Sequence, residues 1–209
     1  MRTILWLEDI TSDDQALVGG KAFNLAEVKR AGFPVPDGFC VTVEAYGGFV
    51  AANGLESAIG SLKGTPSQDM PTAALRLQEA IRAGQMASEA RGAILSAYHE
   101  LTARSGATVP SVAVRSSATA EDLAAASFAG QQATLLNVRD EGQLLQAIVE
   151  CWASLWSPQA VLYRAQQGVS QTPAMATVVQ RMVNAESAGV AFSQDPVTGK
   201  LRVERVKKN

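Results

Sequence analysis

The sequence is poor in the residues that build metal centres and disulfide frameworks. It contains one histidine, His99, which excludes a metal site made of several imidazoles. Because His99 lies on a helical pattern, we interpret it as structural. The two cysteines, Cys40 and Cys151, lie in unrelated contexts. A disulfide framework is therefore not expected, and a cytoplasmic location is the default.

Long apolar runs and an excess of one charge are also missing. The apolar runs are too short to cross a bilayer, and the N-terminal "MRTILWLEDI" soon reaches acidic residues, unlike a signal peptide. The net charge of −2 argues against a basic surface for nucleic acid. With 47% hydrophobic and 18% charged residues, the 209-residue chain has the composition of a folded protein, and neither nucleic acid nor membrane is expected as a partner.

Alternating strand-like and helical patterns predict an α/β (α+β) fold, with a mixed sheet, flanking helices and a helical insert. Residues 1–60 form a first α/β segment, 61–108 a mainly helical subdomain, and 109–209 a second α/β segment. Turn residues at 60–71 predict a linker. Strand candidates lie at 3–7 and 38–43, and in "SVAVRSS", "ATLLNV" and "AMATVVQRMV".

Helices are expected at about 72–84 and 86–104. A further helical pattern at 143–157 carries Trp152 and Trp156 on its apolar side, so we expect both indoles to anchor the core. Pro158 is expected to open the next helix, because proline suits the first helical position.

The stretch "GGKAFNL" has the features of an anion site. Gly19 and Gly20 allow close approach of a ligand, the following helix offers unpaired N–H groups, and Lys21 adds a cation. The pattern is not a Walker A motif. The alternative is an ordinary turn followed by a solvated lysine.

A second cation, Arg115, follows the short strand in "VAVRSS". Arginine is well shaped to fork onto phosphate oxygens. The small residues and hydroxyls between Ser116 and Thr134 suit a loop lying over a phosphate chain. The alternatives are an ordinary surface loop and a structural ion pair between Arg115 and Glu121 or Asp122.

The segment "VVQRMV" ends an apolar run. Main-chain groups there could read an adenine edge, with Met182 against the ring. The alternative is a core strand running into a turn.

Taken together, these stretches resemble the N-terminal nucleotide-binding domain of the phosphoenolpyruvate synthase and pyruvate phosphate dikinase family, which rifampicin phosphotransferases share. The resemblance is carried by "GGKAFNLAEVKRAGFPVPDGFCVT", "AVRSSATAEDLAAASFAGQQATLLNV", "CWASLW", "YRAQQG", "VVQRMV" and "SAGVAFSQDPVTG". These motifs span Gly19 to Gly199, about nine-tenths of the chain.

The resemblance implies an ATP-grasp-type site. It assigns the contacts with ATP phosphates, and a catalytic role, to Lys21 and Arg115. The remaining implied nucleotide contacts are Gly130 and Thr134 at the phosphate loop, Gln180, Met182 and Val183 at the adenine linker, and Glu186 near the ribose.

Two features depart from the family pattern. Ala124 and Ala125 stand where a proline and an acidic residue are usual, and the sequence ends at "LRVERVKKN". The resemblance places the carboxylates that hold Mg²⁺, the phosphohistidine domain and the pyruvate-binding domain beyond that point or on a separate chain. We therefore expect ATP and Mg²⁺ as cofactors, no metal ligands within these residues, and a truncated, catalytically incomplete unit that self-associates through uncovered surface.

Three interpretations stay open. The chain could be the ATP-binding part of a dikinase that phosphorylates pyruvate or another acceptor through phosphohistidine, with a rifampicin phosphotransferase-like domain as a variant. It could be a stand-alone nucleotide-binding or regulatory module. It could also be a structural or interaction domain that kept only the fold.

Overall fold

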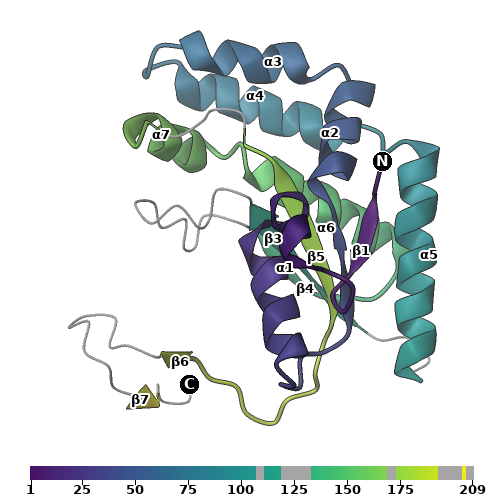
Figure 1. Ribbon diagram of the computed structural model, residues 1–209. Helices are drawn as coiled ribbons and strands as arrows, with labels where there is room; N and C mark the ends of the chain where they lie inside the picture. Colours follow the sequence, from purple (N-terminus) through teal and green to yellow (C-terminus); the bar gives the residue numbers. More distant parts are fainter. Residues whose placement is uncertain (107–110, 119–132, 169–172, 193–203, 206–209) are drawn as a thin grey trace.

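The computed structural model describes residues 1–106, 111–118, 133–168, 173–192 and 204–205 (Figure 1). The predicted contact Gly130, the alanines at 124 and 125, and the acidic residues at 121 and 122 lie outside these ranges.

The centre of the molecule is a five-stranded sheet in the order β1-β2-β5-β3-β4. Its strands are β1 (Ile4–Trp6), β2 (Gly38–Val41), β3 (Val112–Ala118), β4 (Thr134–Val138) and β5 (Met175–Arg181). A separate two-stranded pair is formed by β6 (Ala191–Phe192) and β7 (Glu204–Arg205). The predicted α/β class is confirmed, but every pairing among the described strands is antiparallel, so the parallel component expected in a mixed sheet is not found in this part of the chain.

Helices cover the sheet. They are α1 (Gln15–Arg30), α2 (Val43–Ala52), α3 (Glu56–Ser61), α4 (Met70–Ala83), α5 (Ser88–Ser105), α6 (Glu141–Ser154) and α7 (Pro158–Gln166), with short 3-10 turns at Ser12–Asp14 and Leu62–Gly64. The turn-rich linker predicted at 60–71 is partly wrong, because α3, the second 3-10 turn and the start of α4 occupy much of it. Pro158 does open α7, where the Ser157 hydroxyl accepts a hydrogen bond from the Ala160 N–H.

The two faces of the sheet belong to two cores, because strand side chains alternate between faces. On one face Val114, Val179 and Phe39 pack with α2, α4, α5, α6 and α7. On the other face Cys40 and Val178 pack with α1. Figure 1 accordingly shows α1 in front of the sheet and α6 behind it.

The predicted core anchors are confirmed. Trp152 and Trp156 are both 0% exposed. The Trp152 ring packs against Phe49 with a centroid distance of 5.0 Å, and the Trp156 indole N–H donates to the Tyr46 hydroxyl at 2.9 Å. Tyr46 and Phe49 belong to α2, Trp152 belongs to α6 and Trp156 to the turn after α6, so the aromatic cluster joins segments that are far apart in sequence.

Within the part of the chain that the structure describes, no helix has both the length and the apolar character that crossing a membrane requires.

Candidate functional site

Helix α1 is broken at Gly19 where it meets β3. Gly19 has φ +71° and ψ 169°, and a Cβ at this position would lie 2.4 Å from the Ser117 carbonyl oxygen. The Ser117 hydroxyl donates to the Val18 carbonyl at 2.7 Å and accepts from the Ala22 N–H at 3.1 Å. Ser117 therefore replaces the helical hydrogen bonding that is lost at the break and fixes α1 on the sheet.

This docking places Lys21 against the same strand. Its ammonium Nζ donates to the Ser116 carbonyl oxygen at 2.5 Å, and the side chain is partly buried. The predicted cation of the "GGK" stretch thus lies beside the "RSS" stretch, which carries the second predicted cation. The prediction that Arg115 follows a short strand is wrong, because β3 continues to Ala118 and Arg115 lies in its middle.

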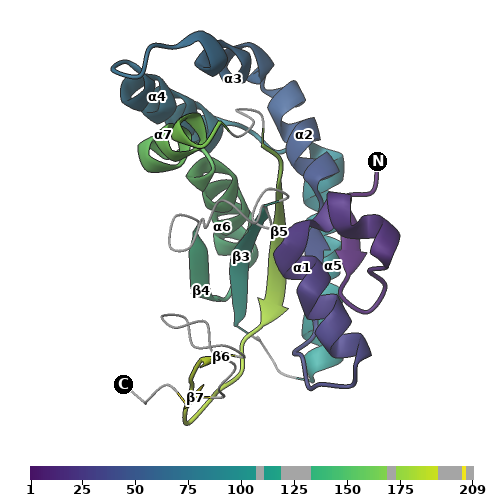
Figure 2. The ribbon, with the colours of Figure 1, turned by 60° about the vertical axis from the view of Figure 1, so that its left-hand side comes forward.

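Arg115 and Thr134 are direct cross-strand neighbours in β3 and β4. Because paired residues share a face, and Ser117 points to α1, both side chains lie on the α1 face of the sheet. Thr134 is exposed, and Leu136, which follows it on this face, is 57% exposed. Figure 2 shows α1 beside β5, with no described helix covering β4 on that side. Among the described residues, therefore, a strip of β4 with exposed side chains lies next to Arg115.

The predicted adenine segment lies at the other end of β5. The Gln180 side chain is buried and donates from Nε2 to the Pro36 carbonyl oxygen at 3.0 Å. The Met182 N–H donates to the Ser111 carbonyl at 2.9 Å. That main-chain donor is already used within the protein, which favours neighbouring linker groups for any contact with a base.

Val183 and Glu186 follow β5 and are exposed. The Val183 side chain is 59% exposed, and its carbonyl oxygen accepts from the Ala185 N–H at 2.9 Å. The structure thus places Arg115 in the middle of β3, with Thr134 opposite it and the Lys21 contact one residue further along the strand, and the linker residues follow the end of β5. Four strand residues, about 13 Å, separate Thr177 beside Lys21 from Arg181 beside the linker.

The described residues offer no group of three or more His, Cys, Asp or Glu side chains that could hold a metal ion. Cys40 and Cys151 are buried free thiols, and desolvation raises the pKa of each, to about 12 for Cys151. Both thiols are therefore held protonated and unsuited to metal binding. His99 is on the surface of α5, where its Nε2 lies 2.7 Å from Glu141.

A groove with a volume of about 610 Å³ opens on the helical side of the molecule. It is lined by Arg82, Gly84, Gln85, Met86, Arg91, Leu145, Gln146, Val149 and Glu150. None of the residues predicted to contact nucleotide is among them. One of its two arginines, Arg82, is paired with Glu150 at 3.0 Å.

Sequence reasoning missed Ser117 as the residue that docks α1. The tandem serines suggest ligand donors, whereas the hydroxyl of Ser117 is committed to Val18 and Ala22. A helix break at Gly19 could have been anticipated from the double glycine, but its partner on a distant strand carries no local signal.

A family model and individual relatives point to the same protein family. Residues 15–207 match the family described as pyruvate phosphate dikinase, AMP/ATP-binding domain. The chain is 44% identical over 205 residues to phosphoenolpyruvate synthase of Aeropyrum pernix, and the aligned region covers 95% of this chain and 25% of the relative. It is 43% identical over 209 residues to a probable phosphoenolpyruvate synthase of Staphylothermus marinus, covering 97% and 25%.

A third relative, phosphoenolpyruvate synthase of Pyrococcus furiosus, is 41% identical over 234 residues, covering 94% of this chain and 29% of the relative. The chain therefore spans between a quarter and a third of the length of these relatives. Together with the antiparallel sheet and the docked "GGK" helix, these matches show that the chain belongs to the pyruvate phosphate dikinase AMP/ATP-binding domain family.

Proposed function

We propose that this chain binds ATP as the nucleotide-binding part of a phosphoenolpyruvate synthase-like dikinase. The phosphates lie toward Lys21, Arg115 and Thr134, and the adenine lies toward the linker after β5. In such an enzyme a phosphoryl group from ATP passes through phosphohistidine to pyruvate or another acceptor. The observation that carries the proposal is that Lys21 contacts β3 at Ser116, next to Arg115, whose partner on β4, Thr134, is exposed.

The chemistry of these groups suits a phosphate chain. A lysine ammonium and an arginine guanidinium neutralise phosphate charge, and Arg115 can donate two parallel N–H groups to its oxygens. The hydroxyl of Thr134, directly opposite Arg115, adds a donor at the same place. Gly130 and the rest of the segment between β3 and β4 remain part of the proposed site by resemblance.

The linker residues suit the base end. Gln180, Met182 and Val183 follow one another on and after β5, and the exposed Val183 and Glu186 are accessible to a ligand. We assign Gln180, Met182 and Val183 to the adenine and Glu186 to the ribose. Since the Met182 N–H is bound to Ser111, its thioether is the group we expect against the ring.

Mg²⁺ normally neutralises the transferred phosphoryl group. The resemblance assigns the carboxylates that hold this ion to another part of the enzyme, and to this chain the part of holding and orienting ATP. We therefore propose that these residues alone bind nucleotide without turning it over, and that further domains complete the reaction.

The proposal is tested by titration calorimetry of the purified chain with ATP, with and without Mg²⁺. Replacing Lys21 with Met should weaken ATP binding about 10- to 100-fold, the range for loss of one charge-assisted contact. Arg115→Met should act similarly. Lys63→Met removes an exposed lysine from the helical side and should leave the affinity unchanged.

Thermal unfolding of each variant shows whether the fold survives, since Lys21 also bonds Ser116. If folded wild-type chain binds no ATP at millimolar concentration, nucleotide binding by this chain is wrong. If the pure chain hydrolyses ATP and Lys21→Met abolishes that activity, the proposed division of labour is wrong.

A further inference from the structure

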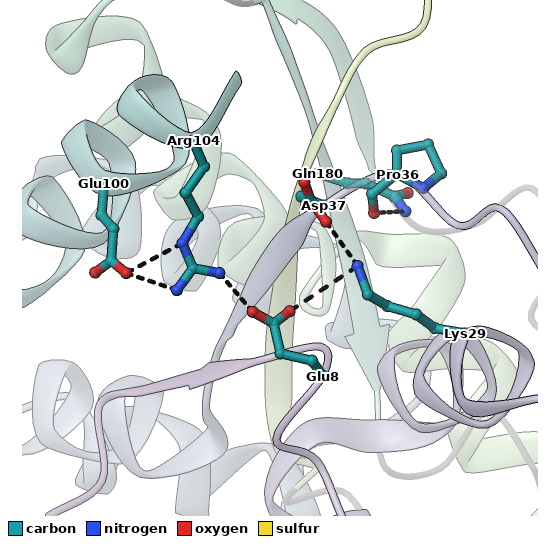
Figure 3. A network of polar contacts seen from close by, with 7 residues as sticks. All are labelled: Glu8, Lys29, Pro36, Asp37, Glu100, Arg104 and Gln180. Atoms are coloured by element: carbon teal, nitrogen blue, oxygen red, sulfur yellow. Dashed lines mark hydrogen bonds and ion pairs between the residues drawn. The ribbon is translucent and has the colours of Figure 1, made fainter. Parts of the chain in front are cut away.

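A chain of ion pairs joins the far end of α1 to the segment before β2 (Figure 3). Lys29 Nζ lies 2.7 Å from Asp37 Oδ1 and 4.0 Å from Glu8 Oε2. The hydrogen bond from Lys29 holds the pKa of Asp37 below its usual value, so the pair is charged at neutral pH. We call Glu8, Lys29, Asp37, Glu100 and Arg104 the Lys29 network.

The network is held from a third element. Arg104, in the last turn of α5, donates from Nη1 to Glu8 at 2.5 Å and from Nη2 to Glu100 at 2.6 Å. Its guanidinium carbon lies 3.8 Å from the centroid of the Trp6 ring. Glu8 is thereby held between Arg104 and Lys29, so the Lys29 side chain is restrained rather than freely solvated.

Residues 36–38, which include the Lys29 partner Asp37, also contact the end of β5. The Asp37 carbonyl oxygen accepts from the Arg181 N–H at 2.9 Å, and the Pro36 carbonyl oxygen accepts from Gln180 Nε2 at 3.0 Å. The contact is close, since a Cβ on Gly38 would lie 2.5 Å from the Val179 carbonyl oxygen. A shift of residues 36–38 would therefore move the Gln180 side chain and the start of the linker.

One helix thus contacts both ends of the proposed site. Lys21 and Lys29 are eight residues apart on α1, a rise of about 12 Å. The strand distance from Thr177, beside Lys21, to Arg181, beside the linker, is about 13 Å. Helix α1 therefore runs the length of the proposed nucleotide site, with its first part against β3 and its last turn against residue 37.

We propose that Lys29 and Asp37 are positioning residues for the base end of the nucleotide. They act through Gln180 and the linker and touch no ligand themselves. This inference rests on the proposed function and gives Lys29 and Asp37 a role that the sequence motifs did not indicate. It predicts that breaking the pair weakens recognition of the nucleoside and leaves recognition of the phosphate chain intact.

The test compares two ligands, ATP and inorganic triphosphate, by calorimetry on the full chain. Lys29→Met and Asp37→Ala should each weaken ATP binding about three- to tenfold, the effect of losing one partly exposed pair and its positioning. Triphosphate affinity should stay as in wild type. Lys29→Arg keeps a cation at this position and should restore most of the ATP affinity. The double variant should be no weaker than the worse single variant, because both substitutions break one interaction.

Arg82→Met is the matched control. It removes another partly exposed ion pair, with Glu150 at 3.0 Å, from the helical side. It should change neither affinity. If wild type binds ATP and the Lys29 and Asp37 variants bind it equally well, the inference is wrong. Equal loss of ATP and triphosphate binding would also overturn it, since that outcome indicates a general effect on the fold. Failure of wild type to bind ATP would instead defeat the proposed function.

Discussion

Gly19 and Ser117 lie in contact although α1 and β3 are far apart in sequence. The Ser117 carbonyl oxygen occupies the place that a Cβ on residue 19 would need, at 2.4 Å, and the Ser117 hydroxyl bridges the residues on either side of the helix break. This contact holds the first turns of α1 against β3, next to Ser116, whose carbonyl oxygen accepts from Lys21.

Gly19→Ala should therefore destabilise the protein. The new methyl group meets backbone rather than a flexible side chain, and φ +71° is strained for alanine. We expect a loss of about 2–4 kcal/mol in the free energy of unfolding, measured by urea denaturation.

Gly47→Ala is the control for this substitution. Gly47 lies inside α2, where a Cβ would meet no described atom of another element within 4 Å, and its φ is not left-handed. Alanine there should stabilise the helix by up to about 1 kcal/mol. Equal losses for the two variants would show that the Gly19–Ser117 contact does not limit the fold.

Asp14 should contribute stability that depends on pH. Its buried carboxylate accepts from the Thr11 N–H and hydroxyl, both at 2.9 Å, and from Arg2 at 2.7 Å. The backbone bond from Thr11 is the main reason that its pKa lies below the ordinary value of 3.8. Asp14→Asn should cost about 1–2 kcal/mol at pH 7.

The sign of the pH dependence follows from the lowered pKa. The contribution is complete above the unfolded-state pKa near 4 and is lost as the pH falls through the folded-state pKa. The difference between wild type and Asp14→Asn should therefore shrink below about pH 4. Asp13→Asn, at the exposed neighbouring position, should stay within about 0.5 kcal/mol of wild type. A difference for Asp14→Asn that is independent of pH would contradict this account.

Arg164 is a buried cation whose hydrogen bonding is incomplete. It is 1% exposed, and Nη1 donates to the Leu155 carbonyl at 2.8 Å, while Nε and Nη2 have no partner among the described residues. Burial lowers the pKa of Arg164 to about 10. Because the guanidinium has no carboxylate partner among the described residues, Arg164→Met should change the free energy of unfolding by no more than about 1 kcal/mol in either direction.

Trp156→Ala is the variant with which the stability of Arg164→Met is compared. The two side chains are neighbours, since the guanidinium carbon of Arg164 lies 5.2 Å from the centroid of the Trp156 ring. Removing the fully buried indole should cost about 3–5 kcal/mol. A loss of this size for Arg164→Met would instead show that the arginine has compensating partners and contributes strongly to the fold.

Local patterns predicted much of the architecture. The helical spacing of Trp152 and Trp156, proline at the start of α7, and the short apolar strands each report a property of neighbouring residues, so sequence reasoning located them correctly. It was less successful at 60–71, where glycine, proline and serine predicted a linker. There, Leu62 and Met70 are buried in the main core and hold a short 3-10 turn and the start of α4 in place. Burial of these side chains outweighs the turn propensity of the residues around them.

The sequence by itself determined the family and predicted the two cations and the linker segment, because each corresponds to a contiguous motif. Only the tertiary structure decided how they meet. Strand β5, late in the chain, inserts between β2 and β3, which brings Gln180 against Pro36. The pairing of β3 with β4 places Arg115 beside the exposed Thr134. The same arrangement joins Lys21 to Ser116 and Lys29 to Asp37. Contacts between positions so far apart in sequence depend on strand order and helix docking, so local sequence patterns do not predict them.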